Sequence, residues 1–103
     1  MNSKLLEIIE HYGVLKQLKQ FHSEVYELVE ASIQKEEAQF NRFKGYRTND
    51  DINELKKYIA EEIADCYVML EQFRLYYSIS THELKDIMDY KIERQLRRIE
   101  DEK

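Results

Sequence analysis

Apolar residues recur at intervals of three and four along most of this chain, and almost nothing interrupts the pattern. The sequence of 103 residues contains no proline and only two glycines. Because proline and glycine are the residues that most disfavour a helix interior, a chain with so few of them can form long helices. The pattern therefore predicts an all-α fold.

Two interruptions divide this periodicity. Gly13 is expected to separate a short helix from a long one. The stretch NRFKGYRTND, residues 41–50, is basic and aromatic, and holds Gly45 and several turn-forming residues. It is expected to be a loop, either a mobile flap over a ligand or a solvated turn, and the sequence leaves its role open.

Capping signals mark the starts of the last two helices. Asp51 and Ser80 are each followed three residues later by a glutamate, the spacing of a capping box. The helices are therefore expected at residues 3–11, 12–38, 51–77 and 81–100.

The length of these helices indicates how the chain assembles. One domain is expected, over residues 1–103. Helices of roughly 25 residues are about 37 Å long, and three of them cannot enclose a compact core along that length. We therefore expect an antiparallel helical bundle of three to four helices, completed by dimerisation, in a homodimer or homotetramer. The last helix is expected to bury Leu84, Met88, Ile92, Leu96 and Ile99.

Charge and cysteine content narrow the expected partners and location. The net charge of −5 argues against a surface that tracks nucleic acid, so no nucleic-acid partner is expected. The single cysteine, Cys66, offers no disulfide framework and is expected in the core. Without a signal-like or membrane-length apolar segment, we expect a cytoplasmic protein with no membrane partner.

Carboxylates stand at positions where the apolar pattern calls for hydrophobic side chains. Glu62 is three residues after Ile59 and four before Cys66, so it shares their side of the helix. Glu24 likewise lies between Phe21 and Leu28. Burying an unpaired charge is costly, so either such a helix rotates its acid to an edge or a positive charge meets it.

Each of these acids has a second acid three residues on, which gives the pairs Glu24 with Glu27 and Glu62 with Asp65. Four carboxylates that converge from two antiparallel helices repel one another, and divalent cations relieve that repulsion most simply. No histidine follows either first acid at the spacing used by di-iron bundles, so Mg²⁺ is favoured, with Mn²⁺ as a substitute. The alternative is that the pairs lie on solvated helix faces.

A row of cations lies on the last predicted helix. Lys91, Arg94 and Arg98 follow one another at spacings of three and four. Next to bound Mg²⁺, such a row suits a polyphosphate, because the metal bridges its oxygens and the cations neutralise the remaining charge. The alternative is pairing with nearby acids or stabilisation of the helix C-terminus.

The sequence resembles the MazG-like nucleotide pyrophosphohydrolases of the all-α NTP pyrophosphatase superfamily. The resemblance rests on the stretches QLKQFHSEVYELVEA, IAEEIADCYVMLEQ and DYKIERQLRRI, which occur in the order of the family. It departs from the family in two places: Ser23 replaces an acid before Glu24, and 34 residues lie between Glu27 and Glu62, more than is usual.

The resemblance implies a Mg²⁺-dependent enzyme that cleaves a (d)NTP to the (d)NMP and pyrophosphate, in nucleotide-pool house-cleaning. It implies metal ligation by Glu24, Glu27, Glu62 and Asp65 and phosphate contacts from Lys91 and Arg94. Among the acids, Glu27 is the expected general base and Glu24 the second catalytic group. Gln17 and Phe21 are the nearest candidates for nucleobase contacts, although both also suit a helix core.

A different class of function fits the same residues. On this reading the chain is a non-catalytic helical-bundle protein with an interaction or regulatory role. Its acids form a solvated face, and the cations of Lys91 to Arg98 bind an acidic partner or a nucleic acid.

Overall fold

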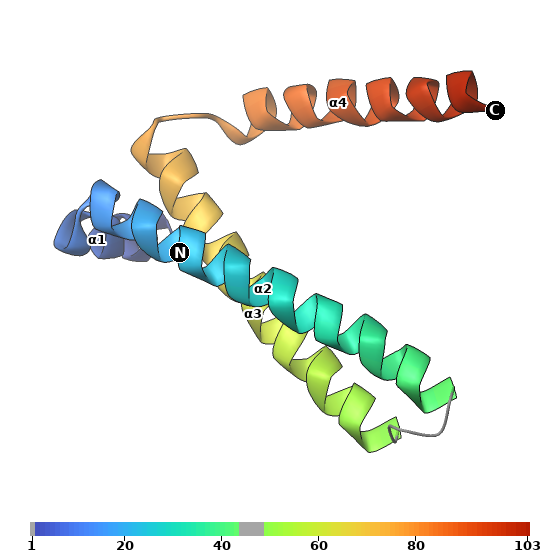
Figure 1. The fold of residues 1–103 in the computed structure, drawn as a ribbon. Helices are drawn as coiled ribbons and strands as arrows, with labels where there is room; N and C mark the ends of the chain where they lie inside the picture. The colour runs from blue at the N-terminus through green and yellow to red at the C-terminus, as the bar shows by residue number, and fades with distance from the viewer. Residues whose placement is uncertain (1, 44–48) are drawn as a thin grey trace.

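The computed structural model describes residues 2–43 and 49–103, and within these ranges the chain is helical with no strand (Figure 1). This confirms the predicted all-α fold class. Four helices follow one another: α1 (Asn2–Tyr12), α2 (Val14–Phe43), α3 (Asn49–Tyr76) and α4 (Thr81–Glu102).

Gly13 forms the break between α1 and α2, as its position in the pattern predicts. Its φ of +88° lies in the left-handed region that glycine adopts at little cost. The Gly13 amide donates to the Ile9 carbonyl over 2.8 Å, and the Gly13 carbonyl accepts from the Gln17 amide over 3.1 Å. One residue therefore ends α1 and starts α2 in a new direction.

The predicted loop over residues 41–50 is wrong at both of its ends. Helix α2 continues to Phe43 and α3 already begins at Asn49, and residues 44–48 lie outside the described part of the chain. Asp51 consequently lies within the first turn of α3, two residues after its first residue. Residues such as Asn, Arg and Phe cost a helix less than about 0.7 kcal/mol each, which is too little to end a long helix. The predicted cap at Ser80 is confirmed, since its side chain accepts from the Glu83 amide over 3.1 Å.

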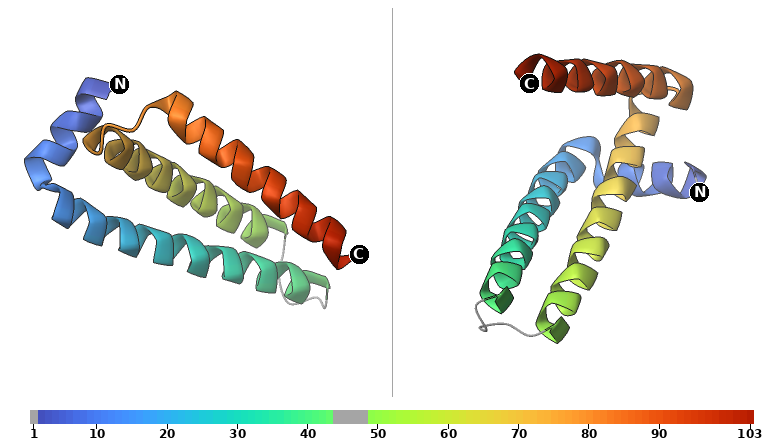
Figure 2. Two further views of the ribbon diagram at one scale, coloured as in Figure 1. Left: turned by 90° about the horizontal axis from the view of Figure 1, so that it is seen from above. Right: turned by 90° about the vertical axis from the view of Figure 1, so that its right-hand side faces the viewer.

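Helices α2 and α3 run antiparallel and side by side (Figures 1 and 2). Phe21 and Phe73 meet between them edge to face, with ring centroids 5.5 Å apart. Helix α1 packs across both, mainly on α3. The buried apolar side chains that hold the three helices together are Leu5, Ile9, Ala31, Ala38, Ile52, Cys66 and Met69, so the predicted burial of Cys66 is confirmed.

Helix α4 stands apart from the other three (Figure 2). It packs against none of them and has no buried residue. The expectation that its apolar side is buried is therefore wrong within a single chain. The chain is correspondingly extended: its radius of gyration is 17.9 Å, whereas a compact domain of this length has about 13 Å. No helix in the described ranges has the length and apolar character needed to cross a membrane.

Candidate metal centre

The side of α2 that meets α3 carries polar residues among the apolar ones. Gln17 is 8% exposed, Glu24 is half-buried and Ala31 is buried. On the facing side of α3, Glu62 is only 6% exposed and Cys66 is also buried. The apolar periodicity thus brings Glu24 and Glu62 into the helix interface, and neither helix rotates its acid out to solvent.

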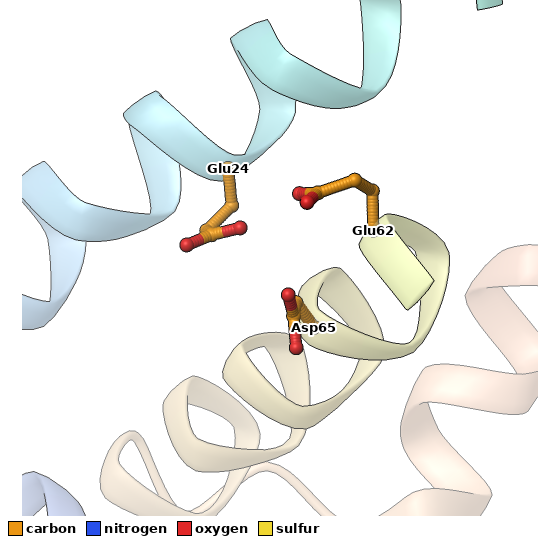
Figure 3. A group of neighbouring side chains, drawn as sticks. All are labelled: Glu24, Glu62 and Asp65. Atoms are coloured by element: carbon orange, nitrogen blue, oxygen red, sulfur yellow. The ribbon is translucent and has the colours of Figure 1, made fainter. Parts of the chain in front are cut away.

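Three acids converge at this interface. Glu24 reaches from α2 toward Glu62 and Asp65 on α3 (Figure 3). One carboxylate oxygen from each lies within 4.8 Å of the other two, close enough for one metal ion to bind all three. Glu62 is buried, Glu24 is half-buried and Asp65 is exposed, so the cluster runs from the interface to the surface.

Two oxygens of this cluster are buried without a hydrogen-bond partner among the described residues. They are Oε2 of Glu24 and Oε2 of Glu62. The other side of Glu24 is satisfied, because Gln20 Nε2 donates to its Oε1 over 2.9 Å. A buried carboxylate oxygen without a donor is costly. These two atoms are therefore free to accept a ligand that carries positive charge.

The electrostatics of the cluster are strongly unfavourable for a bare carboxylate. The pKa of Glu62 is raised from 4.5 to about 7. Burial is the largest cause, followed by the hydrogen bond that a protonated Glu62 can donate to the Glu24 carboxylate and by the negative charges of Glu24, Glu27 and Asp65. No ion pair among the described residues includes Glu24, Glu62 or Asp65. Within the described chain, no lysine, arginine or histidine side chain therefore forms an ion pair with Glu62.

Glu27 lies beside this cluster but outside it. Its side chain is exposed, and its charge raises the pKa of both Glu62 and Tyr58. All four predicted metal ligands therefore lie in one region, but only three bring oxygens within 4.8 Å of one another.

Tyr58 is a neighbour of the cluster that the sequence reasoning missed. It stands four residues before Glu62, and the negative charge of Glu62 is the largest cause of a raised pKa at the Tyr58 hydroxyl. The i, i+4 spacing to a buried acid was the available signal. Cys66 is affected as well: burial, and then the charges of Glu24, Glu62 and Asp65, raise the pKa of its thiol.

The remaining candidates lie elsewhere. Lys91 and Arg94 are on α4, which packs on neither α2 nor α3, so one chain does not bring them to the acids. The Arg94 guanidinium instead lies 6.0 Å from the centre of the Tyr90 ring. Gln17 and Phe21 lie in the helix interface, where Gln17 Nε2 donates to Gln72 Oε1 over 2.8 Å and Phe21 contacts Phe73.

The donor set of the cluster consists of carboxylate oxygens alone. Hard divalent cations such as Mg²⁺, Ca²⁺ and Mn²⁺ prefer such ligands, whereas zinc and copper favour nitrogen and sulfur. The residues present can therefore hold a hard metal ion, and their chemistry does not by itself identify which one.

Comparisons with known proteins found no match to this chain among protein-family models, curated proteins or solved structures. The resemblance to the MazG-like enzymes stays a prediction from the sequence motifs.

Proposed function

We propose that this chain is a Mg²⁺-dependent nucleoside triphosphate pyrophosphohydrolase of the MazG-like type, which converts a (d)NTP to the (d)NMP and pyrophosphate. The observation that carries the proposal is the convergence of Glu24, Glu62 and Asp65, with two buried oxygens that have no donor. A phosphate-bound magnesium ion usually binds proteins through one or two carboxylates together with substrate oxygens, and this cluster suits that mode.

The three clustered acids would hold the metal, with Mn²⁺ as a substitute for Mg²⁺. When bound, the ion would supply activation of water and neutralise charge on the phosphates. Two features of the cluster support this assignment. The raised pKa of Glu62 shows that its ionised form lacks compensation, and the exposed Asp65 gives the site an open side.

Glu27 is the residue that we propose takes the proton from the attacking water. It lies close enough to the cluster for its charge to act on Glu62, yet it is exposed and contributes no oxygen to the three-acid group. A carboxylate that is not saturated by metal is the type of group that general-base catalysis needs. Glu24, a member of the three-acid group, would bind metal and help to orient the attacking water.

The phosphate contacts predicted for Lys91 and Arg94 and the nucleobase contacts predicted for Gln17 and Phe21 stay predictions. The proposed chemistry depends on the acids and does not require these phosphate and nucleobase contacts. The proposed assembly is a MazG-like bundle that a second copy of the chain completes.

The test is a panel of NTPs and dNTPs incubated with the protein and Mg²⁺, with pyrophosphate and orthophosphate assayed separately. We expect pyrophosphate from one or a few nucleotides, and no release in EDTA or with Glu62→Gln. Glu61→Gln is the matched control, because Glu61 is the adjacent acid but is exposed. Full activity of Glu62→Gln, or release that persists in EDTA, would show that the site is wrong.

An interaction protein is the second candidate, and the exposed apolar side of α4 is the observation that favours it. The two candidates differ in their response to metal. An enzyme with this site must melt at a higher temperature in millimolar Mg²⁺, whereas a solvated acidic face gives only the screening effect of an equal ionic strength of NaCl.

A further inference from the structure

We infer that α4 is an arm exchanged between two copies of the chain: each copy lays the apolar stripe of its α4 on the α2–α3 hairpin of the other. This inference does not depend on the chemistry at the acid cluster. It rests on an unpartnered helix, an unpartnered face of the hairpin, a fixed connection between them and the area that the single chain leaves exposed.

The first observation is the apolar stripe of α4. Met88, Ile92 and Leu96 are 52%, 53% and 52% exposed, although they follow one another at helical spacing. A helix of this amphipathic kind gains its stability in proteins by packing the apolar side against another surface. The residues of the stripe are Leu84, Met88, Ile92, Leu96 and Ile99.

The second observation is a matching apolar face on the hairpin. Leu18 and Val25 on α2 directly follow the interface residues Gln17 and Glu24, and Ile63 on α3 directly follows Glu62. One residue turns a helix by about 100°, and because α2 and α3 run in opposite directions, the same turn brings both sets to one side of the hairpin. The exposed members of this hairpin face are Leu18, Val25, Val29, Ile33, Ile63, Tyr67 and Leu70.

A shallow groove of about 380 Å³ marks the α2 part of this face. Three aliphatic side chains line it, together with one serine and two acids. Such a groove suits the apolar side of an amphipathic helix, which contributes anchors at i, i+3 and i+4 spacing. The lining residues are Leu28, Val29, Ser32, Ile33, Glu36 and Glu37.

The connection from α3 to α4 argues that the occupant is another chain. The Arg74 guanidinium pairs with the Glu71 carboxylate at 2.9 Å and donates to the Ile79 carbonyl over 2.9 Å. The Ile79 amide in turn donates to the Arg74 carbonyl over 3.0 Å, and Ser78 adopts a φ of 57°. These bonds fix the turn so that α4 leads away from its own hairpin (Figure 2). The stripe can then be covered only from outside the chain.

The exposed area indicates how large that cover is. The chain exposes 8398 Å², whereas a compact monomer of 12.6 kDa exposes about 6,200 Å². The excess of roughly 2,200 Å² matches what one partner buries in a large, obligate homodimer interface. Reciprocal exchange of two identical arms covers both stripes and both hairpin faces with one two-fold axis.

The first experiment measures the mass of the full chain in solution by light scattering and sedimentation, at micromolar concentration. We expect a dimer for the native sequence and a monomer for Ile92→Glu. Tyr90→Glu is the matched control. Tyr90 is also a large, exposed side chain of α4, 61% exposed, but it lies on the side of the helix opposite to the stripe. The Tyr90→Glu variant should therefore remain a dimer. Circular dichroism should show that both variants keep their helices. A native monomer, or a dimer that Ile92→Glu leaves intact, would overturn the inference.

The second experiment distinguishes exchange from docking within one chain. In a Cys66→Ala background, Ile33→Cys is placed in a chain with a size tag, and Met88→Cys, Ile92→Cys or Leu96→Cys in an untagged chain. Mild oxidation of the mixed chains should produce a disulfide between the tagged and the untagged chain for at least one of the three pairs. No mixed disulfide in any pair, or a disulfide that forms only when both cysteines are in the same chain, would show that α4 does not cross.

Discussion

The carboxylates of Glu24 and Glu62 meet across the interface of two antiparallel helices, and each keeps one buried oxygen without a hydrogen-bond donor in the described chain. A hydrophobic pair at these positions would pack more favourably than two acids that repel. The metal-free fold is therefore destabilised at this place, and a bound divalent cation would relieve the repulsion. The stability of the protein should consequently report on the site even when no substrate is known.

Replacing the charge of Glu62 should stabilise the metal-free protein. We expect Glu62→Gln to raise the melting temperature in EDTA at pH 8, because it removes one of the repelling charges and keeps the side-chain volume. Recovery of about 1 kcal/mol would correspond to roughly 4–8 °C for a domain of this size. Thermal melting followed by circular dichroism measures the shift. Glu61→Gln should change the melting temperature little, and an equal rise for both variants would show that the effect is one of net charge alone.

The raised pKa of Glu62 also predicts how stability depends on pH. In the folded protein the carboxyl group of Glu62 keeps its proton up to about pH 7, whereas an unperturbed glutamate loses its proton near pH 4.5. Between these values the native state binds more protons than the unfolded state, so the contribution of Glu62 to the free energy of unfolding falls as pH rises and is level above pH 7. Urea unfolding in EDTA at pH 5, 6, 7 and 8 should show this fall. The fall should be smaller in Glu62→Gln, and parallel profiles for the two proteins would contradict the assignment.

Metal binding should have the opposite dependence on pH. A metal ion needs the ionised carboxylate, so it must displace the proton that Glu62 holds below about pH 7. We expect calorimetric titration with Mn²⁺ or Mg²⁺ to give about tenfold weaker binding at pH 6 than at pH 8, with protons released on binding at the lower pH. Equal affinities at both pH values, with no proton release, would show that Glu62 is not a ligand.

The approach of Glu24 to Glu62 was predictable from sequence because it depends on helix periodicity. Glu24 and Glu62 each fall at a position that the apolar spacing assigns to the interface, and two helices joined by a short connection run antiparallel, so their acids meet. The placement of α4 was not predictable in the same way. Its apolar stripe shows that it packs on something, but spacing carries no information on whether that surface belongs to the same chain. The sequence also predicted the wrong end for α2 and the wrong start for α3. The residues around Gly45 have the composition of a loop, although most of them have ordinary helix propensity.

The buried pair of Gln17 and Gln72 should behave as a unit. Their side chains share a 2.8 Å hydrogen bond inside the helix interface. Gln17→Leu leaves the Gln72 amide without its partner and should cost about 1–3 kcal/mol in urea unfolding. Gln17→Leu combined with Gln72→Leu should cost much less than the single change, because no polar group is then stranded. Additive costs would show that the two amides are satisfied independently, and would leave Gln17 available for another role.

Glu24 and Glu27 should separate metal binding from catalysis. Glu24 belongs to the group of oxygens within 4.8 Å of one another, whereas Glu27 stands beside that group and is exposed. We therefore expect Glu24→Gln to weaken Mn²⁺ binding in calorimetry and to abolish turnover as a consequence. Glu27→Gln should retain metal binding within a few-fold but lower kcat by about 10²–10⁴, the usual contribution of a general base. The loss should be largest at the pH optimum of the native enzyme, since the variant lacks the group that accepts the proton.

Glu30→Gln is the control for both assays. Glu30 is an exposed acid one turn further along α2, so this variant should match the native protein in metal binding and in turnover. If Glu27→Gln instead lost metal binding as completely as Glu24→Gln, Glu27 would be a fourth ligand and the base would have to be sought elsewhere.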